Sequence, residues 1–245
     1  MQKSPSPMNT TEEEVRVELA KLYRLVAHLR MTDVVDTHIS ARVPGSQHHF
    51  LINVYGKLFH EIGPADLVKI DTDGNIVEPE KEGHLRVNKA GFVIHSAIHM
   101  ARHDIACVIH THTADGIAVA CQADGLLPIS QHALKFHGRL AYHEYEGIAV
   151  DMGERERLVR DLGNHDAMIL RNHGLLTAGS SIAAAFTNMY FLERACQIQI
   201  KAQSGGAKLH QPHSAVIERA AGQFDPIESN WHSELFWVSA CRMLG

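Results

Sequence analysis

The sequence has few cysteines, no long apolar run and no block of basic residues, and each absence argues against a class of protein. Its four cysteines occur singly, with no Cys-x-x-Cys pair, so the pattern favours buried free thiols over disulfides. No stretch approaches the ~18 uninterrupted apolar residues that a membrane-spanning helix needs. With 28 acidic and 23 basic residues and no basic stripe, the chain lacks the charge pattern of a nucleic-acid-binding protein.

The chain of 245 residues, 45% of them apolar, is long enough to bury a substantial core. Residues 1–9 are polar, contain two prolines and are expected to be disordered. They also lack the apolar segment of a signal peptide, which predicts a cytoplasmic protein. No long linker or internal repeat interrupts residues 10–245, so we expect a single domain there, with a C-terminal helical extension from about residue 204.

The first third of the domain has the pattern of one helix followed by short strands. Thr11 and Glu14 form a capping-box motif before an apolar stripe of helical spacing. Alternating or apolar runs then predict strands at 38–43, 50–54 and 66–71, and the last should turn through 71–75 into residues 76–77. No strand–helix–strand alternation is visible in this part.

The rest of the sequence mixes helices and strands. Helices are predicted at 88–103, 114–121, 154–163 and from Ser180 or Ser181 to about 203, with a final helix through Trp231. Strands are predicted at 105–109, 147–150 and 167–170. The patterns together indicate one α/β domain built on a sheet with antiparallel segments.

Histidine is unusually frequent, with 19 residues, and two of them form a His-x-His motif at the end of an apolar strand. Because side chains alternate along a strand, His110 and His112 should lie on the same face. Two neutral imidazoles at this spacing can chelate a divalent ion, most often zinc. Cupins also carry His-x-His on a strand, but they place a carboxylate four or five residues later. Gly116 and Ile117 occupy those positions here, so the cupin interpretation fails.

A third histidine, His173, follows the predicted strand 167–170 and precedes Gly174. It could return to the same end of the sheet, and three histidines would leave one metal position open, as in catalytic zinc sites. The alternative is that His173 only caps a turn. Spacing alone does not separate the two.

Several motifs in order along the chain resemble the class II aldolase/adducin family. They are Asp36-Thr-His-Ile-Ser-Ala-Arg42, Ile52-Asn-Val-Tyr-Gly56, Asn88-Lys-Ala-Gly-Phe92, Val108-Ile-His-Thr-His112, Leu126-Leu-Pro-Ile-Ser130 and Asn172-His-Gly-Leu-Leu176. The resemblance implies a three-layer α/β/α fold with a central, largely antiparallel or mixed sheet. It also implies a divalent metal, usually zinc, held by His110, His112 and His173, and a homotetramer with sites at subunit boundaries.

The sequence departs from the aldolases of that family at the residues that move protons and hold phosphate. The resemblance places the aldolases' catalytic, metal-binding glutamate at Gly91, which has no side chain to move a proton or to bind a metal. Their phosphate-binding Gly-Asn, Ser-Gly and Ser-Ser pairs fall on Thr37-His38, Tyr55-Gly56 and Lys89-Ala90. Most of the backbone and hydroxyl donors for a phosphate are therefore missing, and the pattern is closer to the adducin-like branch.

Two other histidines are candidates for the missing catalytic group. His95 begins a stripe with His99 and His103 on one helix face and lies one turn beyond Gly91, so it could replace the glutamate or could be a buried, hydrogen-bonded histidine. His132 lies near the position where some family aldolases carry a catalytic tyrosine, and it could donate a proton near neutral pH. Its alternative is a solvated loop residue.

Two functions follow from these observations. The first is a metal-dependent lyase or isomerase acting on a small, sugar-like hydroxy-carbonyl compound. The second is an adducin-like, non-catalytic oligomerising module that keeps the metal site and binds a protein partner. For either function we expect a homo-oligomer, to which the apolar C-terminal helix with Trp231, Phe236 and Trp237 would contribute buried surface.

Overall fold

The computed structural model of the protein describes residues 10–77, 87–147, 153–224 and 226–245. The predicted disorder of residues 1–9 and most of the predicted strand 147–150 lie outside these ranges. The α-helices are α1 (Glu12–His28), α2 (Lys89–Ala101), α3 (Ala114–Ala120), α4 (Gln131–Leu134), α5 (Glu154–Leu162), α6 (Ile182–Gln203), α7 (Ser214–Gly222) and α8 (Pro226–Cys241). The strands are β1 (His38–Arg42), β2 (His49–Asn53), β3 (Leu67–Asp71), β4 (Cys107–Thr111), β5 (Ala141–His143), β6 (Ala167–Leu170) and β7 (Gly174–Gly179).

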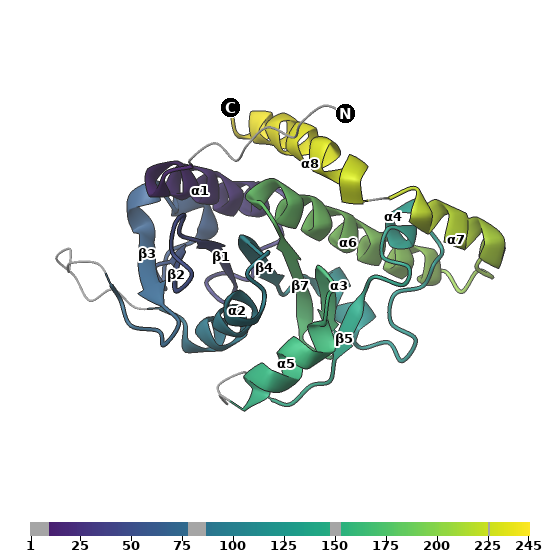
Figure 1. The fold of residues 1–245 in the computed structure, drawn as a ribbon. Coiled ribbons are helices and arrows are strands. Elements are labelled where there is room, and N and C mark those ends of the chain that lie inside the picture. Colours follow the sequence, from purple (N-terminus) through teal and green to yellow (C-terminus); the bar gives the residue numbers. More distant parts are fainter. Residues whose placement is uncertain (1–9, 78–86, 148–152, 225) are drawn as a thin grey trace.

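The seven strands form one mixed sheet in the order β3-β2-β1-β4-β7-β6-β5 (Figure 1). Every neighbouring pair is antiparallel except β5 and β6, which run parallel. In the register of β1 and β4, His38 is opposite His110. The predicted α/β class and the largely antiparallel sheet are confirmed.

Helices cover both faces of the sheet and give the molecule three layers (Figure 1). Helices α1 and α6 pack on one face, in a core that includes Cys107 and Ile109 of β4. Helices α2 and α5 pack on the other, in a core that includes Val108. Because side chains alternate along β4, His110 shares the face of Val108, the side of α2 and α5.

Local signals set several of the predicted boundaries. The capping box is present: Thr11 Oγ1 accepts a hydrogen bond from Glu14 N, and the Glu14 carboxylate accepts one from Thr11 N. Ser181 caps α6 by accepting from Ala184 N. Asp71 Oδ1 accepts from two backbone amides of its turn, and residue 76 bridges back to residue 70. Each of these signals acts within about four residues, which is why the sequence alone reveals them.

Two strands of the structure are not predicted by the sequence pattern. Strand β5 has three residues, too few for a periodic pattern, and β7 lies where Gly174 indicates the start of a turn. Strand β7 is buried along its whole length between β4 and β6, so it shows no apolar–polar alternation. Strand β4 also lies two residues later than the predicted strand 105–109.

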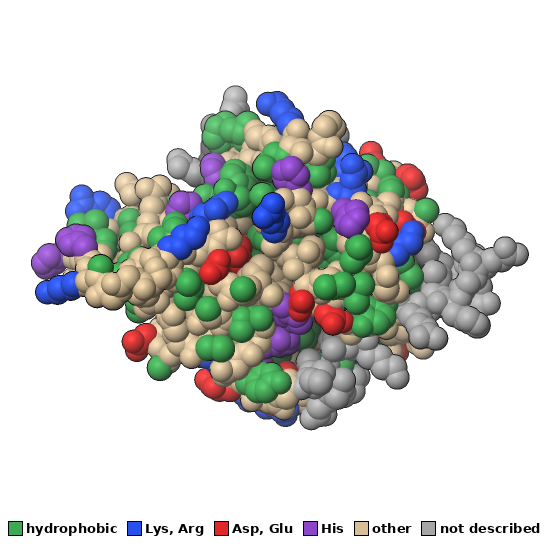
Figure 2. Space-filling model, turned by 180° about the vertical axis from the view of Figure 1, so that it is seen from behind, with side chains coloured by type: hydrophobic (Ala, Val, Ile, Leu, Met, Phe, Trp, Pro, Cys, Tyr) green, Lys and Arg blue, Asp and Glu red, His purple; other side chains and the backbone are tan. Residues whose placement is uncertain are grey.

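Two helices, α7 and α8, follow the break after α6, and α8 lies alongside α6 and also contacts α1 (Figure 1). Trp237 of α8 is buried, and its indole N–H donates to Glu18 Oε2 at 2.7 Å. Among the described residues, no helix is both long and apolar enough to cross a membrane. On the face shown in Figure 2, basic side chains are interspersed with acidic and apolar ones.

Candidate metal centre

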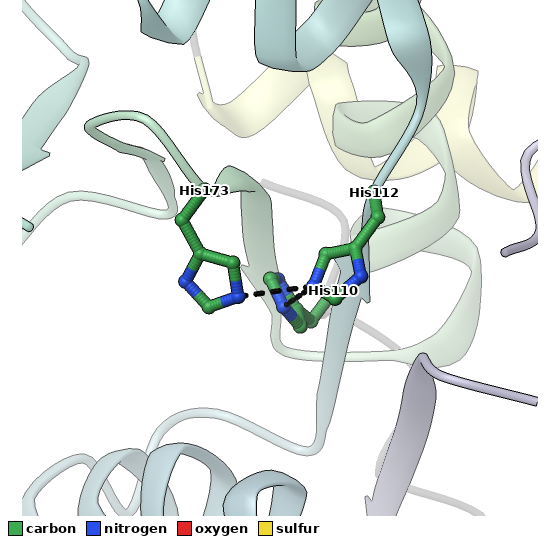
Figure 3. Close-up of side chains that lie close together, drawn as sticks. All are labelled: His110, His112 and His173. Carbon is green, nitrogen blue, oxygen red and sulfur yellow. Dashed lines mark hydrogen bonds between the residues drawn. The ribbon is translucent and has the colours of Figure 1, made fainter. Parts of the chain in front are cut away.

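The structure brings His110, His112 and His173 together at one end of the central strands (Figure 3). His110 belongs to β4, His112 follows that strand, and His173 lies in the turn between β6 and β7. The Nε2 atoms of His110 and His112 are 2.9 Å apart, and those of His112 and His173 are 3.0 Å apart. The turn places His173 beside the His-x-His motif because β7 returns along β4.

Hydrogen bonds on the far side of two rings decide where their protons are. His110 Nδ1 lies 2.9 Å from the carbonyl oxygen of Leu175, and His112 Nδ1 lies 3.1 Å from Asp33 Oδ2. Both partners are acceptors, so each Nδ1 carries the hydrogen. In the neutral rings, the two Nε2 lone pairs then face each other. A cation between them removes the repulsion, and this outer hydrogen bonding is typical of histidines that ligate metals.

Burial keeps two of these rings, those of His110 and His173, in the neutral state that a metal ligand requires. His110 is 1% exposed, and burial lowers its pKa well below 6.5, helped by the neighbouring histidines. Burial, with His112 and His143, lowers the pKa of His173 to about 4. Both rings are therefore unprotonated near pH 7, and a divalent ion would not have to displace a proton from either.

Three histidines would occupy three of the four positions around a tetrahedral metal ion and would leave the fourth open. In the described ranges, no Asp, Glu or Cys side chain joins the three imidazoles, whose ligand atoms lie within 4.8 Å of one another. Three neutral nitrogen donors fit zinc, and a fourth position would be free for a small molecule. His112 and His173 are only partly buried, which leaves the centre reachable from solvent.

The space next to Gly91 is filled by His38. A Cβ at position 91 would lie 2.2 Å from His38 Cδ2 and 2.5 Å from its Nε2, closer than atoms can approach. The His38 ring also lies beside His110, with 5.3 Å between ring centroids. An imidazole therefore occupies the place in which the resemblance puts the aldolases' glutamate. The sequence indicates at Thr37-His38 only a loss of phosphate contacts, because nothing local in that motif predicts contact with residue 91.

His95 lies behind His38 and is not one of the three converging histidines. His95 Nε2 is 2.9 Å from His38 Nδ1, and its Nδ1 is 2.6 Å from Ser40 Oγ, which also bonds His99 Nε2 at 2.8 Å. His95 and His99 are fully buried, and burial lowers the pKa of both. His103, the third member of the stripe, is exposed. The structure therefore places His95 in a hydrogen-bonded network that supports His38.

His132 lies on the short helix α4, also outside the three-histidine cluster. It is half-buried against Phe191, with ring centroids 5.2 Å apart, and burial and Arg194 lower its pKa. An exposed aromatic residue, Tyr145, lies beside the centre: its ring is 6.5 Å from that of His173. Tyr145 is therefore placed to contact a molecule at the open position.

Comparisons with known proteins identify the family of the chain. The family model "Class II Aldolase and Adducin N-terminal domain" matches residues 17–200. A Pseudomonas aeruginosa protein, itself only provisionally assigned as a class 2 aldolase, is 51% identical over 97% of this chain and 91% of its own length. Alpha-adducin of Rattus norvegicus is 42% identical over 80% of this chain but only 27% of its own length. An L-fuculose 1-phosphate aldolase from Glaciozyma antarctica has a similar structure, with a TM-score of 0.86 and 26% identity over 98% of this chain and 94% of that one. The chain belongs to the class II aldolase and adducin family.

Proposed function

We propose that the protein is a metal-dependent, aldolase-like lyase or isomerase that acts on a small hydroxy-carbonyl compound. The observation that carries this proposal is the convergence of three Nε2 atoms, two of them with the hydrogen fixed on Nδ1, around one point. His110, His112 and His173 would hold a divalent ion, most simply Zn²⁺. Such an ion supplies Lewis-acid polarisation of a carbonyl oxygen.

The residues around the centre favour a substrate without a phosphate group. His38 takes the place of an asparagine that helps to hold phosphate in the aldolases, and its ring is buried and bonded to His95. Gly91 supplies no carboxylate to move a proton, and a positioned acid or base is typically worth about 10²- to 10⁴-fold in rate. We therefore expect a hydroxy acid or ketone as substrate, and slow turnover of sugar phosphates.

An assay of the zinc-loaded protein tests this expectation. Fuculose 1-phosphate and ribulose 5-phosphate should be turned over at least 10²-fold more slowly than the ~10 s⁻¹ typical of enzymes, while a panel of unphosphorylated hydroxy acids and ketones is searched for faster cleavage or epimerisation. The protein with His110, His112 and His173 replaced by alanine measures the background. Turnover of either sugar phosphate near 10 s⁻¹ would contradict the proposal.

A non-catalytic, adducin-like module is the second candidate. Two observations favour it. The chain is 42% identical to alpha-adducin over 80% of its own length. The His38 ring fills the space next to Gly91 in which the resemblance puts the aldolases' glutamate. In this case the protein would bind zinc through the three histidines but turn over nothing in the panel above the background of the alanine variant. A protein partner would then be its ligand.

Either function is proposed for a homotetramer. Helix α8 supports an assembly because Trp231, Leu235 and Val238 are each at least half exposed on it. Trp237, by contrast, packs inside the chain and is not available. Light scattering at micromolar concentration should give about four times the 27.2 kDa of the chain, and replacing Trp231 and Leu235 by glutamate should lower that mass. A wild-type mass of one chain would contradict the proposal.

A further inference from the structure

A cavity of about 380 Å³ lies at the end of the central strands opposite to the three-histidine centre. Its wall includes Asp166 and Ala167, where β6 begins, and Ser180, which follows β7. His173 lies between the other ends of these two strands. Further parts of the wall come from the end of α4, from α6 and from the residues after α7, and α4 contacts both of these helices (Figure 1). The volume falls within the ~300–1,000 Å³ of small-molecule sites.

The ammonium group of Lys135, in the wall of this cavity, has aromatic neighbours but no acceptor. Its Nζ lies 5.6–6.0 Å from the ring centroids of Phe136, Phe191 and Phe224. These rings attract the positive charge, but they leave the N–H donors without an oxygen. Within the ranges that the structure describes, Lys135 has no hydrogen bond and no ion pair. A partly buried ammonium in this state calls for an acceptor from outside the chain.

A second cation, Arg139, lines the same cavity. Its Nη1 donates to the carbonyl oxygen of Phe224 at 2.6 Å, and no carboxylate of the described residues pairs with it. Burial lowers the pKa of Lys135, and the charge of Arg139 lowers it further. The two cations therefore lie close enough to repel each other, and an anion between them would remove the repulsion.

The acidic residues of the wall do not balance these two cations. Asp104 and Asp166 line the cavity, but both pair with Arg102, at 2.7 and 3.2 Å. Arg102, Lys135 and Arg139 thus face two carboxylates, which leaves one positive charge without a counter-ion. A monoanion would cancel this charge and would accept charge-assisted hydrogen bonds from Lys135 and Arg139.

We propose that this cavity binds a small organic carboxylate. The carboxylate would lie against Lys135 and Arg139, and an apolar body would lie against Phe136 and Phe224, which also line the cavity. An inorganic anion would satisfy the cations but would leave these aromatic walls without a contact. The site is separate from the three-histidine centre and does not depend on the proposed function.

Calorimetric titration of the full chain with benzoate tests the proposal. Wild type should bind benzoate, and the protein with His110, His112 and His173 replaced by alanine should bind it as tightly, because the cavity lies at the other end of the strands. Lys135→Met keeps the length of the side chain but removes the charge, and it should weaken binding by about 10-fold or more. Lys201→Met is the matched control, because Lys201 is exposed on α6 and does not line the cavity.

Two other ligands separate the charge from the apolar body. Benzyl alcohol lacks the charge and inorganic phosphate lacks the ring, so each should bind about 10-fold more weakly than benzoate or worse. In crystals soaked with 4-bromobenzoate, the bromine should give an anomalous peak inside the cavity, with a carboxylate oxygen ~2.7–2.9 Å from Lys135 or Arg139 nitrogen atoms.

Four results would overturn the proposal: no binding of benzoate at about 10 mM, unchanged binding by a folded Lys135→Met protein, tighter binding of phosphate than of benzoate, or a bromine peak only outside the cavity. If Lys135→Met does not fold, as judged by circular dichroism, Arg139→Gln takes its place and should show the same loss of affinity.

Discussion

Replacing Gly91 by alanine should destabilise the protein, although the same change usually stabilises a helix by about 0.5–1 kcal/mol. The added Cβ would lie 2.2 Å from the His38 ring, and that ring is buried and bonded to His95. Overpacking of this kind typically costs about 1–3 kcal/mol. Gly91→Glu, which restores the aldolases' residue, should cost at least as much and should not raise activity. Denaturant unfolding measures both changes.

Removing the His38 ring should reverse the effect. In a His38→Ala background, Gly91→Glu should fold with little further loss of stability. If the proposed function is correct, this double variant should also be faster than wild type on a family substrate, by up to about 10²- to 10⁴-fold, since a carboxylate can then move the proton. Gly222→Ala is the control, because a Cβ there meets nothing within 4 Å on helix α7. If the single variant Gly91→Glu is as stable as wild type, the His38 ring can move aside without cost, and the prediction is contradicted.

The sequence predicts those parts of the fold that depend on neighbouring residues. The Thr11 capping box and the Ser181 cap each act within one helical turn, so a single sequence reveals them. Strand β7 depends on its partners instead: it lies between β4 and β6 and is buried along its length. Nothing in Gly174–Gly179 distinguishes such a strand from a loop of small and apolar residues, so the sequence pattern does not predict it.

In the candidate site, too, the sequence predicts some features and not others. His-x-His at a strand end and a histidine after the next predicted strand are enough to select His110, His112 and His173, which the structure brings together. Their binding of metal stays a prediction. The contact between His38 and Gly91 could not be predicted, because it depends on the register of β1 with β4 and on the placement of α2 over both. The sequence shows only that Gly91 has no side chain, whereas in the structure the His38 ring fills the space in which a side chain would lie.

The outer hydrogen bond of His112 gives a graded test of the metal centre. Asp33 accepts from His112 Nδ1 and so helps to keep the Nε2 lone pair directed at the centre. Removing such an orienting group typically weakens metal affinity by about 10- to 100-fold. Asp33→Ala should therefore still bind zinc at the three histidines, but more weakly than wild type and without loss of fold.

The most direct test of the central claim is the difference in bound zinc between wild type and the variant with His110, His112 and His173 replaced by alanine. Both proteins would be purified without chelator, exposed to excess zinc, freed of unbound metal and analysed for zinc and protein, with circular dichroism to verify folding. The three-histidine centre predicts that the folded variant carries one zinc ion per chain fewer than wild type. Equal zinc content in two folded proteins would contradict it.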